Sequence, residues 1–113
     1  MLSAAHRLAK RSDIEAVHKR GRSFFVGNLG LRSAKNNLKV SRFTVIVSLK
    51  VSKKAVDRNR LKRRLREIIR KDVLPAVKPG FDGILITKKS LLLLPFCELR
   101  ELTIKLFKKT RLI

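Results

Sequence analysis

Apolar and polar residues alternate along residues 40–48, VSRFTVIVS, in the pattern of a strand with one buried face. Phe43, Val45 and Val47 fall on one face, and Arg42, Thr44 and Ser48 fall on the other. Ile46 interrupts the polar face, so we expect that face to be partly covered. A further strand is predicted at residues 81–88, FDGILITK.

Residues 23–33, SFFVGNLGLRS, are also typical of a strand, but two glycines interrupt them. Gly27 and Gly30 predict either a bulge or two short strands in place of one. A turn is predicted at residues 35–37, KNN. We expect these segments and the strand at 40–48 to pair as an antiparallel meander.

Two helices are predicted towards the ends of the chain. Ser12 and Glu15 form an S-x-x-E capping box for a short helix over residues 12–21, and Gly21 suits its end. The last helix begins at Pro95, since proline is favoured at the first helical position. Its apolar residues at helical spacing are Phe96, Leu99, Leu102 and Leu106.

A third, central helix is predicted from about Asp57, a suitable N-cap, to about Val73. On a helical wheel, its apolar stripe consists of Leu61, Leu65, Ile68 and Ile69. Two largely basic rows cover the remaining surface, one of Asn59, Arg63, Arg66 and Arg70, the other of Arg60, Arg64, Glu67 and Lys71.

The order helix, strands, helix, strand, helix predicts an α+β fold, a small sheet with helices packed on one side. The length of 113 residues suits a single domain over 1–113. Within it, residues 1–11 are expected to be a loose N-terminus and residues 108–113 a basic tail.

The strongly basic composition of the chain limits the kinds of partner that it is expected to bind. The 29 Lys and Arg residues outweigh 8 Asp and Glu residues, which gives a net charge of +21. A charge of this size favours a polyanionic partner, most often nucleic acid. No apolar run is long enough for a membrane span, and the N-terminus lacks the apolar region of a signal peptide. Its basic first dozen residues leave a transit peptide as an alternative, although a cytoplasmic location is expected.

The charge is concentrated in RNRLKRRLRE, residues 58–67, where six of ten residues are Lys or Arg. A solvated helix face usually mixes charges of both signs, because opposite charges one turn apart stabilise a helix and like charges destabilise it. A nuclear-localisation signal needs an unstructured segment, whereas the Leu/Ile stripe indicates a docked helix. We therefore interpret the basic rows as a polyanion-binding face, and Arg suits bidentate phosphate contacts.

The sequence offers little to a catalytic site. His6 and His18 are the only imidazoles, and neither has the spacing of a Ser–His–Asp triad. With only eight acidic residues, the sequence argues against a nuclease site in which carboxylates hold two metal ions, and no metal-ligand cluster is evident. The single cysteine, Cys97, is expected to be a small core residue. These observations favour a binding protein over a catalyst.

The segment VSLKVSKKAVDRNRLKRRLREIIR resembles the signature of the bacterial ribonuclease P protein subunit. The motif R-N-R-x-K-R-x-x-R-E is present without a gap, as Arg58, Asn59, Arg60, Lys62, Arg63, Arg66 and Glu67. The resemblance extends to HRLAKRSDIEAVHKRGRS near the start and to FDGILITK and LPFCELRELTIKL near the end.

The resemblance implies an αβββαβα, ribosomal protein S5 domain 2-like fold with a left-handed βαβ crossover, against the usual rule. It implies a subunit of an endoribonuclease that removes the 5′ leader of precursor tRNA, in which the RNA subunit and its Mg²⁺ perform catalysis. The expected partners are that RNA, at 1:1, and precursor tRNA; no membrane and no protein partner is expected. The protein itself is expected to carry no catalytic group and to bind no cofactor.

The resemblance also implies two sites. The predicted RNA-binding residues are Lys50, Lys53, Lys54, Arg58, Asn59, Arg60, Lys62, Arg63, Arg66 and Arg70. The predicted cleft for the single-stranded leader contains Ile14, His18, Phe24, Arg42 and Thr44. The family commonly has aromatic residues where this chain has Ile14 and His18, so base stacking is expected either from His18 itself or from Phe24 or Phe25 as a substitute.

Two other function classes stay open from the sequence. One is a ribosomal or RNA-chaperone protein with a basic helix and no role in cleavage. The other is a basic DNA-binding regulator, although no zipper or helix-turn-helix pair is evident. RNA is favoured because RNA helices are recognised mainly through backbone and shape.

Overall fold

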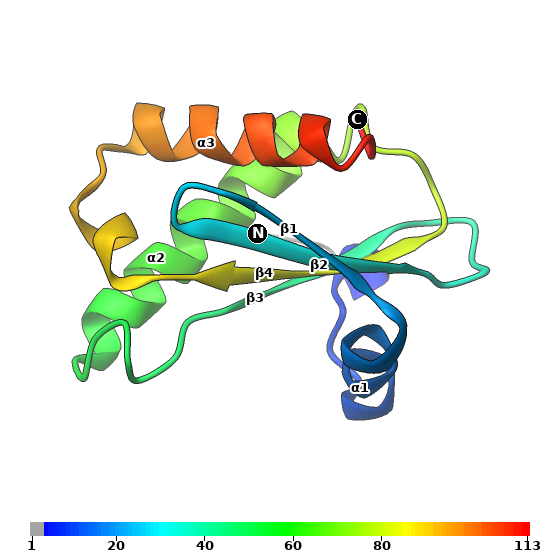
Figure 1. The fold of residues 1–113 in the computed structure, drawn as a ribbon, viewed down its shortest axis with the longest axis horizontal. Helices are drawn as coiled ribbons and strands as arrows, with labels where there is room; N and C mark the ends of the chain where they lie inside the picture. Colours follow the sequence, from blue (N-terminus) through cyan, green and yellow to red (C-terminus); the bar gives the residue numbers. More distant parts are fainter. Residues whose placement is uncertain (1–3) are drawn as a thin grey trace.

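The computed structural model describes residues 4–113. In chain order, the elements are η1 (Ala4–His6), α1 (Arg11–Arg20), β1 (Arg22–Val26), β2 (Leu29–Lys35), β3 (Arg42–Ile46), α2 (Ala55–Ile68), the π-helical turn η2 (Ile69–Val73), β4 (Phe81–Thr87), η3 (Lys89–Leu93) and α3 (Phe96–Lys109). This order confirms the expected α+β arrangement αβββαβα (Figure 1).

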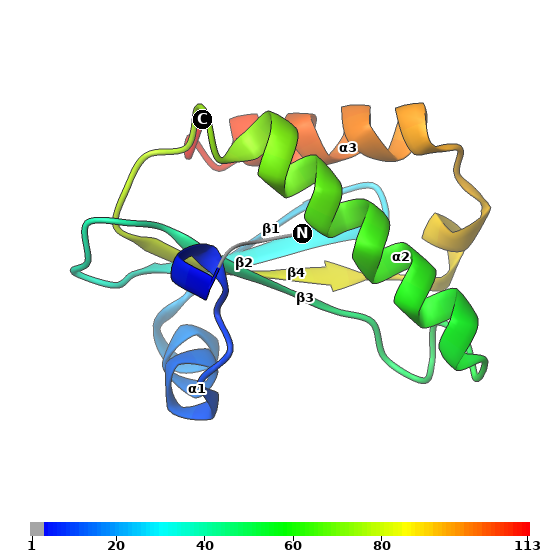
Figure 2. The same cartoon turned by 180° about the vertical axis from the view of Figure 1, so that it is seen from behind.

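The four strands form one mixed sheet in the order β1-β2-β4-β3. The predicted region 23–33 is two strands, with Gly27 in the turn at φ +58°. The predicted meander is wrong, because β2 pairs with β4 and leaves β3 at the edge, parallel to β4. Seen from the side of α2, β4 lies above β3 with both strands running to the right, so the β3–α2–β4 crossover is left-handed (Figure 2).

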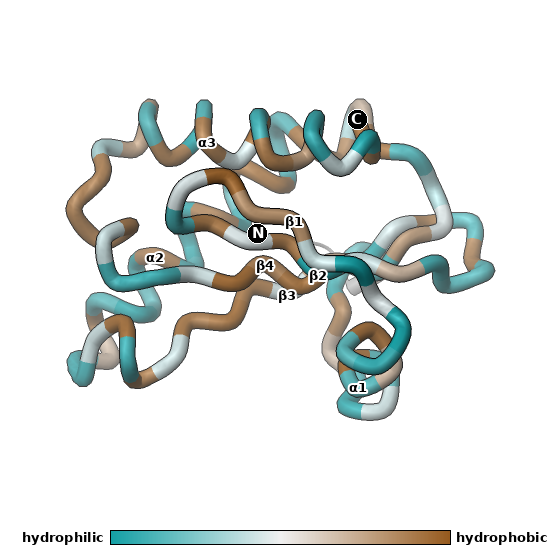
Figure 3. The backbone as a smooth tube through the Cα atoms, in the orientation of Figure 1, coloured by the Kyte–Doolittle hydropathy of each residue, from teal (hydrophilic) through white to brown (hydrophobic). Residues whose placement is uncertain are grey.

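Helices pack on both faces of the sheet, so the expected one-sided covering is also wrong. The larger core lies between the sheet and the pair α2 and α3, where Phe43 and Phe107 meet edge to face with ring centroids 5.4 Å apart. A smaller cluster on the other face joins Leu8, Val17 and Ile84 beneath α1. Figure 3 shows apolar positions concentrated along the strands, whereas α1 is mostly hydrophilic.

The amphipathic stripe of α2 is confirmed. Leu61 is 2% exposed and Leu65, Ile68 and Ile69 are 0% exposed, all in the larger core. Helical structure continues through η2 to Val73, the predicted end. Burial of this stripe therefore turns the polar rows of the helix outwards.

The predicted starts of α1 and α2 need correction. α1 begins at Arg11 without a side-chain cap, and Glu15 accepts a hydrogen bond from Arg11 Nε instead of closing a capping box. α2 begins at Ala55, so Asp57 lies in its first turn rather than at its N-cap. There the Asp57 carboxylate accepts a hydrogen bond from Ser52 Oγ at 3.0 Å.

The ends of the described chain are better anchored than expected. Leu8 is 1% exposed and its N–H donates to the carbonyl of Phe43 at 3.0 Å, so the expected loose N-terminus is wrong from η1 onwards. Residues 1–3 lie outside the described part. In the predicted basic tail, α3 continues to Lys109, and Leu112 is 3% exposed in the core.

Candidate nucleic-acid interface

The outer surface of α2 presents the basic rows predicted from the sequence. Side chains of this helix line a shallow hollow, and these residues are Asn59, Lys62, Arg63, Arg66 and Glu67. Every residue of the hollow belongs to the R-N-R-x-K-R-x-x-R-E segment. The motif therefore forms one continuous surface on a helix that the core holds in place.

Some cations on this helix are paired with its acidic residues. Arg60 lies 3.7 Å from Asp57, and Glu67 is approached by Arg70 at 3.2 Å and Lys71 at 3.5 Å. The hydrogen bond from Arg70 lowers the pKa of Glu67 to about 2, so this carboxylate stays ionised at neutral pH. These contacts stabilise the helix and partly neutralise its basic surface at both ends, near Asp57 and near Glu67.

The cations in the centre of the hollow are different. Within residues 4–113, no carboxylate pairs with Lys62, Arg63 or Arg66. Unpaired guanidinium and ammonium groups at this density repel one another, and an external polyanion would remove that repulsion. The centre of α2 thus has the charge that phosphate binding requires.

The segment before α2 extends the basic surface. Lys50, Lys53 and Lys54 are all exposed there. Arg58 donates from Nη1 to the carbonyl of Ser52 at 2.8 Å and so ties this segment to the helix. The structure therefore brings the ten predicted RNA-binding residues onto α2, its preceding segment and the first turn of η2.

The predicted leader cleft lies on the opposite face of the sheet, where α1 packs. Ile14 belongs to the small cluster under α1, and Thr44 is paired in register with Ile84 of that cluster. His18 is exposed on α1, and its carbonyl accepts a hydrogen bond from Arg32 Nε at 3.1 Å. These residues therefore share one side of the sheet, as the prediction requires.

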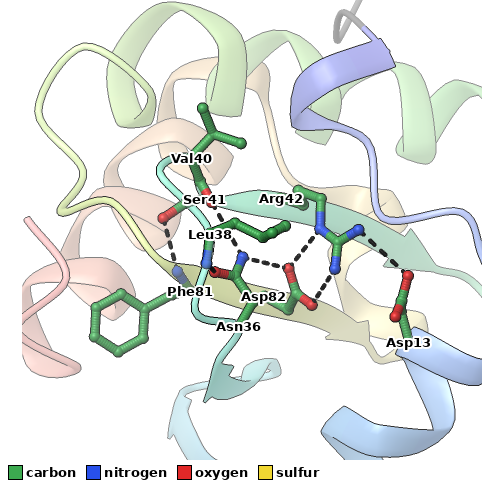
Figure 4. A network of polar contacts seen from close by, with 8 residues as sticks. All are labelled: Asp13, Asn36, Leu38, Val40, Ser41, Arg42, Phe81 and Asp82. Atoms are coloured by element: carbon green, nitrogen blue, oxygen red, sulfur yellow. Dashed lines mark hydrogen bonds and ion pairs between the residues drawn. The ribbon is translucent and has the colours of Figure 1, made fainter.

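Arg42, also predicted for the cleft, is held in a polar network (Figure 4). Its guanidinium donates to both carboxylate oxygens of Asp82, and from Nη1 to Asp13 of α1 at 3.3 Å. Asn36 donates to the same Asp82 carboxylate at 2.8 Å. The hydrogen bond with Asp82 raises the pKa of Arg42, which stays charged. Arg42 therefore fixes α1 against the sheet, and its donors are largely used within the protein.

Phe24 is on the wrong face for a cleft under α1. It is in register with Leu31, which is 0% exposed in the larger core, and Phe24 packs against that core. Its neighbour Phe25 points to the α1 side because successive side chains of a strand alternate. Phe25 is therefore the aromatic residue that this face offers to a base.

The position of Phe25 depends on Gly30 of the neighbouring strand. A Cβ atom on Gly30 would lie 2.4 Å from the Phe25 ring, so the ring occupies the space of the absent side chain. The ring remains 44% exposed, and Lys88 Nζ lies 5.7 Å from its centroid. Ile46, on the same face, is 38% exposed. Phe25 and its neighbours thus form an open apolar patch beside a cation.

Sequence reasoning missed the role of Arg32. Its side chain donates to the carbonyls of Val17 and His18 at the end of α1 and to Ser23 Oγ. This cation therefore caps the end of α1 and ties it to β1 and β2. A basic residue in a strand opposite a helix end carries no recognisable spacing signal in the sequence.

A sequence model of the family described as Ribonuclease P matches residues 2–111. This chain belongs to the ribonuclease P protein family. It is 42% identical over 91 residues to the "Ribonuclease P protein component" of Microcystis aeruginosa, an alignment that covers 77% of this chain and 75% of the relative.

Solved structures of ribonuclease P proteins have the same fold. The protein from Thermotoga maritima superposes with a TM-score of 0.82 at 33% identity, covering 91% of this chain and 96% of that one. A Staphylococcus aureus RNase P protein mutant gives a TM-score of 0.88 at 22% identity, covering 96% and 91%. The latter, at its low identity, supports the fold alone.

The single cysteine of this ribonuclease P family member lies at the surface. Cys97 is exposed at the start of α3, so its expected place in the core is wrong. Over residues 4–113, no group of three or more His, Cys, Asp or Glu residues is arranged to hold a metal ion. In the same residues, no helix combines the length and apolar character needed to cross a membrane.

Proposed function

We propose that this chain is the protein subunit of ribonuclease P and assists an RNA subunit in removing the 5′ leader of precursor tRNA. The observation that carries the proposal is the uninterrupted R-N-R-x-K-R-x-x-R-E motif on the outer face of α2, in a chain of this family. A generic basic protein has no physical reason to combine this motif with this fold.

In this proposal, the RNA subunit binds the basic surface of α2 and the segment before it. The central cations, Lys62, Arg63 and Arg66, contact phosphates, because no carboxylate in residues 4–113 competes for them. The paired residues Arg60 and Arg70 contribute less until RNA displaces their partners. With about six phosphate contacts, affinity falls roughly 10³-fold between 50 and 200 mM salt.

The single-stranded leader lies across the α1 side of the sheet. Phe25 offers its ring to a base, and Lys88 beside it attracts a phosphate. Base–aromatic stacking contributes about 1–3 kcal/mol per base. Ile14, His18 and Thr44 border the same side, whereas Arg42 acts by holding α1 in position.

The protein contributes electrostatics and position, and the RNA subunit contributes catalysis. When bound, Mg²⁺ supplies charge stabilisation to phosphoryl transfer. We assign that ion mainly to the RNA subunit, whose phosphates supply the oxygen ligands that Mg²⁺ prefers. A net charge of +21 lowers the repulsion between two RNA backbones that must approach each other. One protein per RNA subunit, acting in the cytoplasm, completes the proposal.

Reconstitution tests this proposal directly. The purified chain is mixed with a bacterial ribonuclease P RNA at low Mg²⁺, and cleavage of precursor tRNA at the 5′ end is measured. We expect cleavage well above that of the RNA alone, and the advantage should shrink as Mg²⁺ is raised. Equal cleavage with and without the protein, despite RNA binding, would indicate a general RNA-binding or chaperone protein instead.

A further inference from the structure

A second basic hollow lies far from the basic start of α2. It has a volume of about 720 Å³, within the usual range of ligand sites. The C-terminus and the turn between β2 and β3 lie at one end of the molecule, and the start of α2 lies at the other (Figure 1). The proposed leader site is also separate, because none of Ile14, His18, Phe25 and Thr44 lines this hollow, and its aromatic residues Phe24 and Phe81 pack against the larger core.

The hollow exists because α3 is too short to cover its face of the sheet completely. α3 ends at Lys109, and the chain then turns at Arg111, whose φ of +62° is uncommon for a residue other than glycine. Beyond this turn, Leu112 returns to the core, and its carbonyl accepts a hydrogen bond from the N–H of Lys78 at 2.7 Å. The chain end thereby forms one wall of the hollow.

The lining combines cations with aromatic rings. Five exposed basic residues surround the hollow, and these are Arg20, Arg22, Lys35, Lys78 and Arg111. In the part of the chain described by the structure, no acidic residue lines the hollow, and none of the five has a carboxylate partner. Phe24 and Phe81, both partly buried, supply ring surface from β1 and β4.

We propose that this hollow, which we call the terminal groove, is a second binding site for single-stranded RNA. Cations that follow a backbone, together with aromatic rings on which bases stack, are the features by which proteins hold single strands. The groove also explains Phe24, which the fold removes from the leader site but leaves partly open here. This inference rests on the proposed function in one respect, since it takes the ligand of this basic protein to be RNA.

The test uses the full chain and a fluorescent single-stranded RNA dodecamer as the probe, with anisotropy measured over a salt series. The groove variant combines Arg22→Gln with Arg111→Asn, because asparagine tolerates positive φ. The matched control combines Lys105→Gln with Lys108→Gln, which removes the same amount of charge. Both lysines are exposed on α3 and lie outside the groove. We expect the groove variant to lose at least tenfold in affinity at 50 mM salt and about 1.4 in the slope of log K against log salt.

Phe81→Leu tests the stacking part of the proposal. It keeps an apolar side chain at the edge of the core, and we expect roughly fivefold or greater loss of affinity with an unchanged salt slope. Equal losses in the groove variant and the α3 control would overturn the proposal, since net charge alone would then explain both.

Two further measurements distinguish the source of the RNA. If the groove variant weakens assembly with the ribonuclease P RNA, the RNA subunit occupies the groove; if assembly is normal but precursor tRNA binds less tightly, the substrate occupies it. A variant that is normal in both measurements would show that the groove is unused in the complex, against the proposal. Lys62→Gln with Arg63→Gln serves as a separate arm, because its effect on assembly tests the proposed function independently of the groove.

Discussion

The guanidinium of Arg42 donates two hydrogen bonds to the carboxylate of Asp82, from Nε at 2.8 Å and from Nη2 at 2.7 Å. The side chains are only 20% and 7% exposed, respectively. Replacement of Arg42 by Ala would leave a buried carboxylate without its cation and would free α1 from the contact with Asp13. We expect a loss of about 3 kcal/mol in the free energy of unfolding, measured by urea denaturation.

An exposed ion pair provides the control for that measurement. Arg11 and Glu15 are 93% and 59% exposed, so Arg11→Ala should cost about 0.5 kcal/mol or less. Similar losses for Arg11→Ala and Arg42→Ala would contradict a special role for the buried network.

The centre of the α2 surface should control assembly with RNA. Replacement of both Lys62 and Arg63 by Gln should weaken binding to the ribonuclease P RNA and lower the salt slope by about 1.8, roughly 0.9 for each phosphate contact. Because neither side chain is in the stripe that packs on the core, unfolding stability should change by less than about 0.5 kcal/mol. Binding is measured by filter retention over a salt series, and Lys105→Gln with Lys108→Gln is the charge-matched comparison. A large drop in stability would show that this basic surface is structural.

Phe25 and Phe96, two exposed aromatic residues, should have different effects on precursor tRNA binding when they are replaced. Phe25→Ala removes the ring on the α1 side, so we expect precursor tRNA to bind about 1–3 kcal/mol more weakly while mature tRNA, which lacks the leader, is unaffected. Phe96→Ala removes an exposed ring of α3 that lies outside both the leader site and the terminal groove, so it should leave this discrimination intact. The two affinities are compared by equilibrium binding to the reconstituted complex. Equal losses for precursor and mature tRNA would argue against leader contact by Phe25.

The ionisation of Glu67 gives a prediction about pH. Arg70 lowers the pKa of Glu67 from 4.5 to about 2. At a pH between these two values, the carboxylate is mostly ionised in the folded chain and mostly protonated in the unfolded chain. The stabilisation from this pair is fully present above about pH 4.5 and is lost as the pH falls towards 2. NMR titration of the Glu67 side chain should follow this value, and Arg70→Gln should return the pKa towards 4.5. An unchanged titration in that variant would remove Arg70 as the cause.

The features predicted best from the sequence are those set by neighbouring residues. The spacing of Leu61, Leu65 and Ile68 identifies the buried side of α2 because a helix repeats every few residues. The same periodicity determines which cations face outwards. The R-N-R-x-K-R-x-x-R-E motif adds specificity, since it places these residue types on that helix without a gap.

The features that were missed depend on contacts between distant segments. The pattern at 40–48 predicts a strand correctly, but it contains no information on whether β2 or β4 is its partner. Alternation separates Phe24 from Phe25, yet which of them faces α1 depends on the face of the sheet against which α1 packs. Likewise, Arg42 and Asp82 are separated by 40 positions, and the residues around either one do not indicate that the two side chains form a pair.

The central position of β4 has a consequence for how the chain matures. β1 and β2 can form a hairpin early, but β3 has no partner in the sheet until β4 has been synthesised and inserted between β2 and β3. The protein therefore completes its core only when most of its length has left the ribosome, and pairing over such separations is slow relative to local structure. During that interval, the basic helix is available while its apolar stripe is still uncovered. An RNA partner that neutralised the helix at this stage would act as a folding aid as well as a ligand.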